Sequence, residues 1–214
     1  IWLEGITGWG NYRSHLVSTV KLSFMGLLIG SGVGIIIAVT LHSLPKLREA
    51  FYPIIILTQN IPIIVLAPLL VIWFGFGMLP KIIVITLVCF FPITVAALDG
   101  FRHTTAELTH YMKMAGASKK QIFWKVEWPY ALPSLFSGLK IAATYSVMGA
   151  VISEWLGAKE GIGVFMTLAS SSFRTDRVFV AIFLIMILSL IFFALISSLE
   201  KIIVKGKPKG EGKN

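Results

Sequence analysis

Few residues of this sequence have the types and spacing that a chemical reaction requires. The chain contains no G-x-x-x-x-G-K-[S/T] nucleotide-binding loop, no H-E-x-x-H zinc motif and no Ser-His-Asp constellation. His103 and His110 lie about two helical turns apart, but no cysteine or further acid completes a set of metal ligands. We therefore predict no catalytic residue, no metal site and no cofactor bound by this chain.

The chemistry that remains is that of polar groups inside apolar runs. Gln59 and Asn60 lie near the middle of the apolar run 51–74. Three prolines interrupt this run: Pro53, Pro62 and Pro68. Backbone groups freed at that depth are tolerated only where protein or a watery cavity satisfies them, and interrupted helices near the midplane indicate a translocation path. The alternative is a kinked helix whose two amides bond to a neighbouring helix.

Glu154 is a second polar group of this kind, close to the end of the apolar run 131–156. An acidic group in a membrane segment is a candidate for function, although a carboxylate at the interface can also be merely solvated. Together with Gln59, Asn60 and Pro62, it forms our set of candidates for a path or its gate.

These residues must be positioned by helices that cross a membrane. The 214 residues are 56% hydrophobic and only 14% charged, whereas soluble domains are about a quarter charged. Five apolar runs have the length of membrane spans: 22–41, 51–74, 82–98, 131–156 and 178–199. The prediction is an all-α, polytopic bundle of about five transmembrane helices in a lipid bilayer. The net charge of +9 does not indicate nucleic acid, because the basic residues flank the apolar runs.

Small residues in the first span predict close helix packing. Gly26, Gly30 and Gly34 follow one another at intervals of four residues, which lets a neighbouring backbone approach closely. The single cysteine, Cys89, cannot form a disulfide within the chain, and its apolar surroundings predict a packing role.

One long polar segment, residues 99–130, is enclosed between the apolar runs. Within it, Ser118 and Gln121 have the spacing of a capping box, which predicts that a helix begins at Lys119. We expect this helix to be short, because Pro129 cannot donate a helical hydrogen bond and Trp128 before it is pushed toward extended geometry.

The expected helix has an apolar face beside a basic edge. Ile122, Phe123 and Val126 supply the apolar face, and Lys119 and Lys120 lie near its start. Such a helix could bind in a groove on another protein or lie on the headgroups of the bilayer.

Gly116, followed after nine residues by Val126 and then by Trp128-Pro129, resembles the tail of the Glu-Ala-Ala signature loop in membrane subunits of ATP-binding-cassette importers. The match is partial, because His110-Tyr111-Met112 stand in the place of Glu-Ala-Ala. In that family the loop forms coupling helices that sit in a cleft of the cytoplasmic ATPase subunit. The resemblance implies the same role for residues 105–128. The coupling candidates are Gly116, Ala117, Ser118, Lys119, Phe123 and Pro129.

Two further runs, Ile61-Pro62 with Ala67-Pro68-Leu69 and Trp73 to Gly77, resemble the nitrate, sulfonate, taurine and thiamine-precursor branch of these permeases. The runs Ser153 to Ala158 and Ser172 to Phe179 look most like the members that import hydroxymethylpyrimidine-type thiamine precursors. Importers of sulfonate, taurine, nitrate and riboflavin are the alternatives.

The resemblance implies a type I importer permease that is itself no enzyme. Two copies of the chain, expected to form a homodimer, would enclose the pathway. Two cytoplasmic ATPase subunits would bind ATP and Mg, and an extracytoplasmic binding protein would deliver the solute. The location would be the inner membrane of a prokaryote, with multiple passes. A gradient-driven carrier and a non-transporting scaffold subunit are the alternatives from other classes.

Charge supports one orientation of the spans. With the polar segment and the tail inside, twelve Lys and Arg residues face the cytoplasm and six face outward. The predicted units are an extracytoplasmic amphipathic lead-in over 1–21, a permease domain over 22–200 with its coupling loop at 99–130, and a basic cytoplasmic tail over 201–214. A further helix before Ile1 would fit the related permeases, which often have one more.

Overall fold

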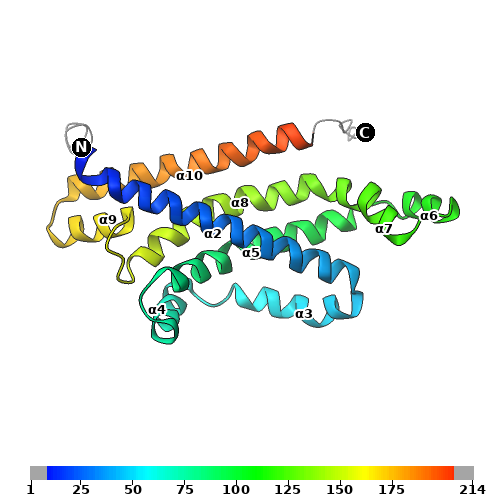
Figure 1. Ribbon diagram of the computed structural model, residues 1–214, viewed down its shortest axis with the longest axis horizontal. Helices are drawn as coiled ribbons and strands as arrows, with labels where there is room; N and C mark the ends of the chain where they lie inside the picture. Colours follow the sequence, from blue (N-terminus) through cyan, green and yellow to red (C-terminus); the bar gives the residue numbers. More distant parts are fainter. Residues whose placement is uncertain (1–8, 205–214) are drawn as a thin grey trace.

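Helices are the only regular secondary structure in residues 9–204, the part of the chain that the computed structural model describes. In chain order they are α2 (Trp9–Ser43), α3 (Pro45–Thr58), α4 (Ile63–Phe74), α5 (Met78–Arg102), α6 (Ala106–Met114), α7 (Lys119–Ile122), the π-helix η1 (Phe123–Glu127), α8 (Trp128–Glu154), α9 (Ile162–Ser171) and α10 (Thr175–Ile203). They form an elongated bundle (Figure 1).

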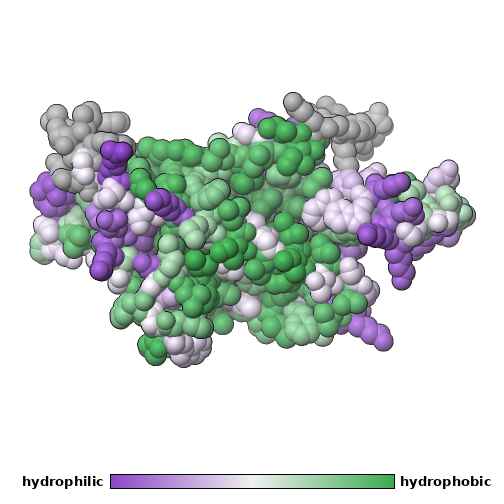
Figure 2. All heavy atoms as spheres, in the orientation of Figure 1, coloured by the Kyte–Doolittle hydropathy of each residue, from purple (hydrophilic) through white to green (hydrophobic). Residues whose placement is uncertain are grey.

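Among residues 9–204, four helical segments are long and apolar enough to cross a membrane: Tyr12–Ser43, Met78–Arg102, Lys119–Glu154 and Thr175–Ile203. The pair α3 and α4 is bent by 98° and makes a fifth if it counts as one span. Apolar side chains cover the middle of the bundle, and hydrophilic ones gather at its two ends (Figure 2). The prediction of about five spans in an all-α membrane bundle is confirmed.

The centre of the bundle consists of α2, α5 and α8, and small residues bring these helices together. A Cβ atom added at Gly30 would lie 2.6 Å from Cβ of Cys89, and one at Gly34 would lie 2.8 Å from a carbonyl oxygen of α5. Thr94 Oγ1 donates to the carbonyl oxygen of Gly34 at 3.1 Å, and Cys89 Sγ donates to that of Ala142 at 3.4 Å. The predicted close packing of the first span and the packing role of the cysteine are confirmed.

The prediction of a short helix after Ser118 is wrong. α7 passes through η1 into α8 as one continuous helical segment from Lys119 to Glu154. Trp128 is helical, and its N–H donates to the carbonyl oxygen of Phe123 in the π register. Proline is tolerated where a helix begins, and the change from π to α register gives Pro129 such a position within the segment.

Other boundaries also differ from the expectation, as at α3, which begins at Pro45 and not at residue 51. The first span was predicted over 22–41, but its helix already begins at Trp9, so residues 9–21 continue into the span without a break. The expected loop between the last two spans contains α9, whose ten residues are too few for a span and were therefore overlooked. The basic tail lies outside the described residues from position 205 onward.

Candidate functional site

The polar segment projects from one end of the bundle, where α6 and α7 form the tip (Figure 1). α6 ends in a Schellman motif: the N–H of Ala117 donates to the carbonyl of Met112, and the N–H of Gly116 donates to that of Lys113, both at 3.0 Å. Gly116 has a φ of +80°, a conformation that side chains other than glycine rarely adopt. This position therefore fixes a sharp turn at the tip.

The capping box predicted after this turn is confirmed. Ser118 Oγ accepts from the N–H of Gln121 at 3.3 Å, and the N–H of Ser118 donates to Gln121 Oε1 at 2.8 Å. α7 begins at Lys119 as expected, and the Lys119 side chain is exposed. The three residues 116–118 thus join two helix ends that are each closed by their own hydrogen bonds.

The apolar face expected for docking on another protein instead packs within this chain. Ile122 and Val126 are buried, and Phe123 is half-buried. The ring of Phe123 lies 5.8 Å from that of Phe101 and 6.0 Å from that of Trp128, measured between centroids. Of the proposed coupling residues, Phe123 therefore belongs to the wall of the bundle, whereas Gly116, Ser118 and Lys119 lie at the surface.

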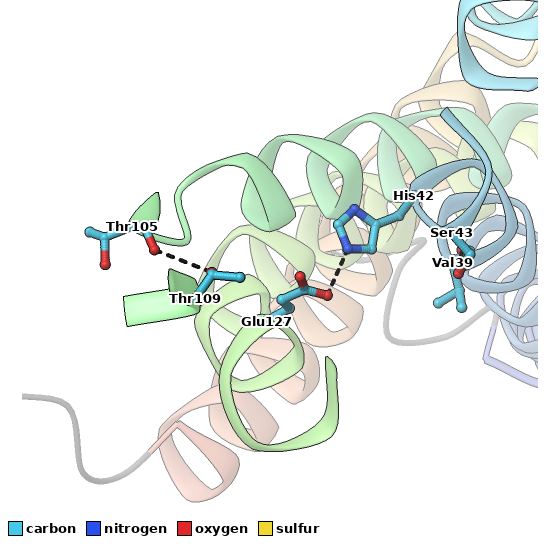
Figure 3. Close-up of polar contacts among 6 residues, drawn as sticks. All are labelled: Val39, His42, Ser43, Thr105, Thr109 and Glu127. Carbon is cyan, nitrogen blue, oxygen red and sulfur yellow. Dashed lines mark hydrogen bonds and ion pairs between the residues drawn. The ribbon is translucent and has the colours of Figure 1, made fainter. Parts of the chain in front are cut away.

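A hydrogen-bonded pair, His42 and Glu127, links the first span to the signature segment, and no sequence pattern predicted it. His42 Nε2, at the end of α2, lies 2.9 Å from Glu127 Oε2, in η1 (Figure 3). The His42 ring also stacks on Phe101 at 4.3 Å. Contacts with Phe101 and Phe123 thus make His42, Phe101, Phe123 and Trp128 one aromatic cluster beneath the tip.

Two large apolar side chains are left exposed on α6. Tyr111 is 65% exposed and Met114 is 70% exposed, although both lie in a polar segment. Sequence reasoning placed them in the coupling range but did not single them out. Their apolar character within a polar loop was the available signal, because exposed apolar groups of this kind mark contact surfaces.

The break in the second apolar run is present, and it holds the predicted polar residues. Gln59 and Asn60 lie between α3 and α4, both exposed, and Pro62 caps the start of α4. Neither amide side chain bonds to a neighbouring helix within residues 9–204. Gln59 lines a cavity of about 440 Å³ between α3, α5 and α8. The other polar residues of its lining are Arg48, Tyr52, Asp99, Arg102 and Tyr145.

Glu154 lies elsewhere, and its side chain is only 1% exposed, so the solvated alternative does not hold. Its Oε1 accepts from Thr19 Oγ1 at 2.7 Å, and its Oε2 accepts from the N–H of Gly163 at 2.8 Å. Thr19 Oγ1 in turn accepts from the N–H of Ile162 at 2.8 Å. Glu154 therefore joins the end of α8 to α2 and to the start of α9, and it does not line the cavity beside Gln59.

Comparison with known proteins identifies the architecture. Residues 30–205 match the family described as "Binding-protein-dependent transport system inner membrane component". The chain belongs to this family. Its members are transport subunits whose ATPase is a separate subunit, so this permease is not an enzyme but a multi-pass component of an ATP-binding-cassette importer.

Individual relatives agree with the family. The formylaminopyrimidine transport permease protein ThiX of Halalkalibacterium halodurans is 36% identical over 92% of this chain and 79% of that protein. The taurine transport system permease protein TauC of Escherichia coli is 32% identical over 86% of this chain and 65% of that protein. A crystal structure of an amino acid ABC transporter with histidines has a TM-score of 0.76 and 16% identity, and it covers 94% of this chain and 98% of its own. That likeness supports the fold alone.

Proposed function

We propose that this permease forms the membrane path of an ATP-driven importer for a hydroxymethylpyrimidine-type thiamine precursor. The observation that carries the proposal is the 36% identity to a formylaminopyrimidine transport permease over 92% of the chain. The runs Ser153 to Ala158 and Ser172 to Phe179 point the same way. The inner membrane of a prokaryote is the location that we infer.

In this proposal two copies of the permease enclose the path, and two ATPase subunits, which bind ATP and Mg, hold the two tips. The exposed turn Gly116-Ala117-Ser118 with Lys119 meets the ATPase, together with Tyr111 and Met114 on α6. Phe123 and Pro129 do not meet the ATPase but pass the movement of the tip on to the bundle, because they lie where the tip joins α8. A movement of the tip then reaches the spans as a rigid-body shift, since the helical segment from Lys119 to Glu154 has no break.

The break between α3 and α4 supplies the path in this proposal. Gln59 and Asn60 are exposed amides at a bend of 98°. Pro62 has no backbone N–H to donate, so the helical hydrogen bonds stay interrupted at this bend. Glu154 serves the gate indirectly, because it holds α9 against α2 at the other end of the bundle. A binding protein outside the cell delivers the solute to that end.

Taurine or another sulfonate is the second candidate solute, favoured by the 32% identity to a taurine permease. Calorimetry with the binding protein that serves this permease distinguishes the two. We expect tight binding of an aminopyrimidine and none of taurine, and the reverse result would overturn the proposed solute. Uptake by proteoliposomes that contain the permease without an ATPase would overturn the proposed energy source.

A further inference from the structure

Two arginines converge on the cavity between α3, α5 and α8. Arg48 lies in the first turn of α3, and Arg102 is the last residue of α5. Both also line a smaller neighbouring cavity of about 290 Å³ between α3 and α5, so the two side chains lie close together. The two positive charges in this lining repel each other unless water or a hydrogen-bond acceptor lies between them.

The Arg48 side chain lines both cavities and is only half-buried. Its Nη2 atom is buried and has no hydrogen-bond partner in the described chain. Neither Arg48 nor Arg102 forms an ion pair within residues 9–204. Asp99 lines the same cavity, but its ion pair is an exposed contact of 3.7 Å with His103. Two guanidinium groups without an ion pair stand against one carboxylate in this lining, so it favours a ligand that brings acceptor atoms.

The remaining lining determines the shape of that ligand. Tyr52 and Tyr145 bring aromatic rings from α3 and α8, and Phe91 brings a third from α5. A guanidinium is a planar fork of N–H donors, which fits two acceptor atoms held in one plane. The Asp99 carboxylate can accept a hydrogen bond from an amino group of the ligand, and its negative charge would repel an anionic group on the ligand. Donor fork, acceptor and aromatic walls together fit a flat ring that carries both acceptor atoms and an amino group.

We propose that this cavity is a solute subsite of the import path, in which Arg48 donates to a ring nitrogen of an aminopyrimidine and Asp99 accepts from its amino group. The inference rests on the proposed function, because it takes the solute to be such a ring. α3 begins directly after the turn at Leu44, on the side of the bundle that carries the tip. The subsite is therefore the last contact before release into the cytoplasm.

The wall that carries Arg48 is suited to release. α3 has a single buried residue, Ile55, so it can shift without opening the packed centre of the bundle. The opposite wall, from α5 and α8, belongs to that centre. A subsite with one fixed wall and one loosely packed wall can release its ligand when the spans move, because the loosely packed wall can shift away from the ligand.

The test uses the complete importer in proteoliposomes, with the ATPase inside and the binding protein outside. Uptake of a labelled aminopyrimidine and hydrolysis of ATP are measured together. We expect Arg48→Gln to lower the uptake per ATP hydrolysed about tenfold, a loss of about 1.4 kcal/mol in recognition. The matched control is Lys46→Gln, which removes a charge from an exposed residue two positions away that lines neither cavity. An equal loss with both variants, or no loss with Arg48→Gln, would overturn the subsite.

A second variant identifies the chemistry. Arg48→Lys keeps the charge but loses the planar fork, so we expect it to leave uptake close to that of Arg48→Gln. Full recovery with Lys would instead indicate an oxyanion held by charge and would overturn the ring as ligand. Asp99→Asn should lower uptake several-fold, and unchanged uptake would remove Asp99 from the subsite. These outcomes are distinct from failure of the proposed function, in which the wild-type importer takes up no aminopyrimidine at all.

Discussion

The centre of the bundle and the α3–α4 pair are built in opposite ways. α5 has twelve buried residues and α8 has thirteen, whereas α3 has one and α4 has two. The loosely packed pair nevertheless carries Arg48, Gln59 and Asn60, three of the polar residues assigned to the path. The tightly packed pair adds Asp99, Arg102 and Tyr145 to the lining of the same cavity. Stability therefore depends mainly on α5 and α8, whereas α3 and α4 contribute to transport and little to the packed centre.

This division has a consequence for mutation. Substitutions of buried residues in α5 and α8 act mainly on folding, since their neighbours must move to admit a new atom. Substitutions in α3 and α4 leave folding nearly unchanged and act on transport. The four predictions below test this contrast, and they run from the largest expected change in stability to the smallest.

The largest effect is expected at Gly138, where α8 crosses α5. An added Cβ atom would lie 2.6 Å from the carbonyl oxygen of Pro92 and 2.7 Å from Cβ of Ala96. We expect Gly138→Ala to lower the free energy of unfolding by about 3 kcal/mol, because neither helix can yield locally. Thermal unfolding in detergent measures the loss. Gly32→Ala is the matched control, because an added Cβ there has nothing within 4 Å, and equal stability of the two variants would contradict the close packing.

A smaller loss is expected at Glu154. Glu154→Ala leaves the buried N–H of Gly163 without its acceptor and leaves the hydroxyl of Thr19 only the carbonyl oxygen of His15, which should lower the free energy of unfolding by about 2 kcal/mol. The same unfolding assay applies. Glu160→Ala removes an exposed carboxylate nearby and should change stability by less than about 0.5 kcal/mol. If Glu154→Ala behaved like that control, α9 would not depend on this contact.

The ion pair between His42 and Glu127 should contribute less again. Both side chains are 21% exposed, so a double-mutant cycle with His42→Ala and Glu127→Gln should give a coupling energy of about 1 kcal/mol. The same variants should lower ATP-dependent uptake, because they loosen η1 from α2. The exposed pair of His103 and Asp99 is the comparison, and its coupling energy should be close to zero. Equal coupling energies would mean that burial adds nothing at His42.

The smallest change in stability is expected for the amides in the break. Gln59→Ala and Asn60→Ala remove exposed side chains without hydrogen bonds in the described chain, so each should change the free energy of unfolding by less than about 0.5 kcal/mol. Uptake should fall at the same time, since both residues face the proposed path. A loss of stability above about 1 kcal/mol with normal uptake would reverse the division between the two regions.

Local features were the ones that the sequence predicted well. The capping box at Ser118, the close approach at Gly30 and Gly34, and the break after Thr58 each depend on residues only a few positions apart. The end expected at Pro129 failed because a π turn, which has no sequence signature of its own, placed the proline at the start of a new register.

The remaining contacts join residues that are far apart in the chain. His42 and Glu127 are 85 positions apart, and Thr19 and Glu154 are 135 apart. Periodicity reveals which face of a helix is apolar, but not which polar residue meets which across the bundle. For that reason Glu154 was identified as important while its partners were not. The arginine-lined cavity likewise exists only once α3, α5 and α8 are placed.

The unbroken helical segment from Lys119 to Glu154 has one mechanical consequence. Its 36 residues span about 54 Å at the usual rise of 1.5 Å per residue. A rod of that length works as a lever: if the ATPase holds the tip as proposed, a tilt of about 5° there displaces the opposite end by roughly 5 Å, which is comparable to one helical turn. Glu154 is hydrogen-bonded to α2 and α9, so this displacement would move both helices at the end of the bundle opposite the tip. A small rotation at the tip would therefore be enough to change that end.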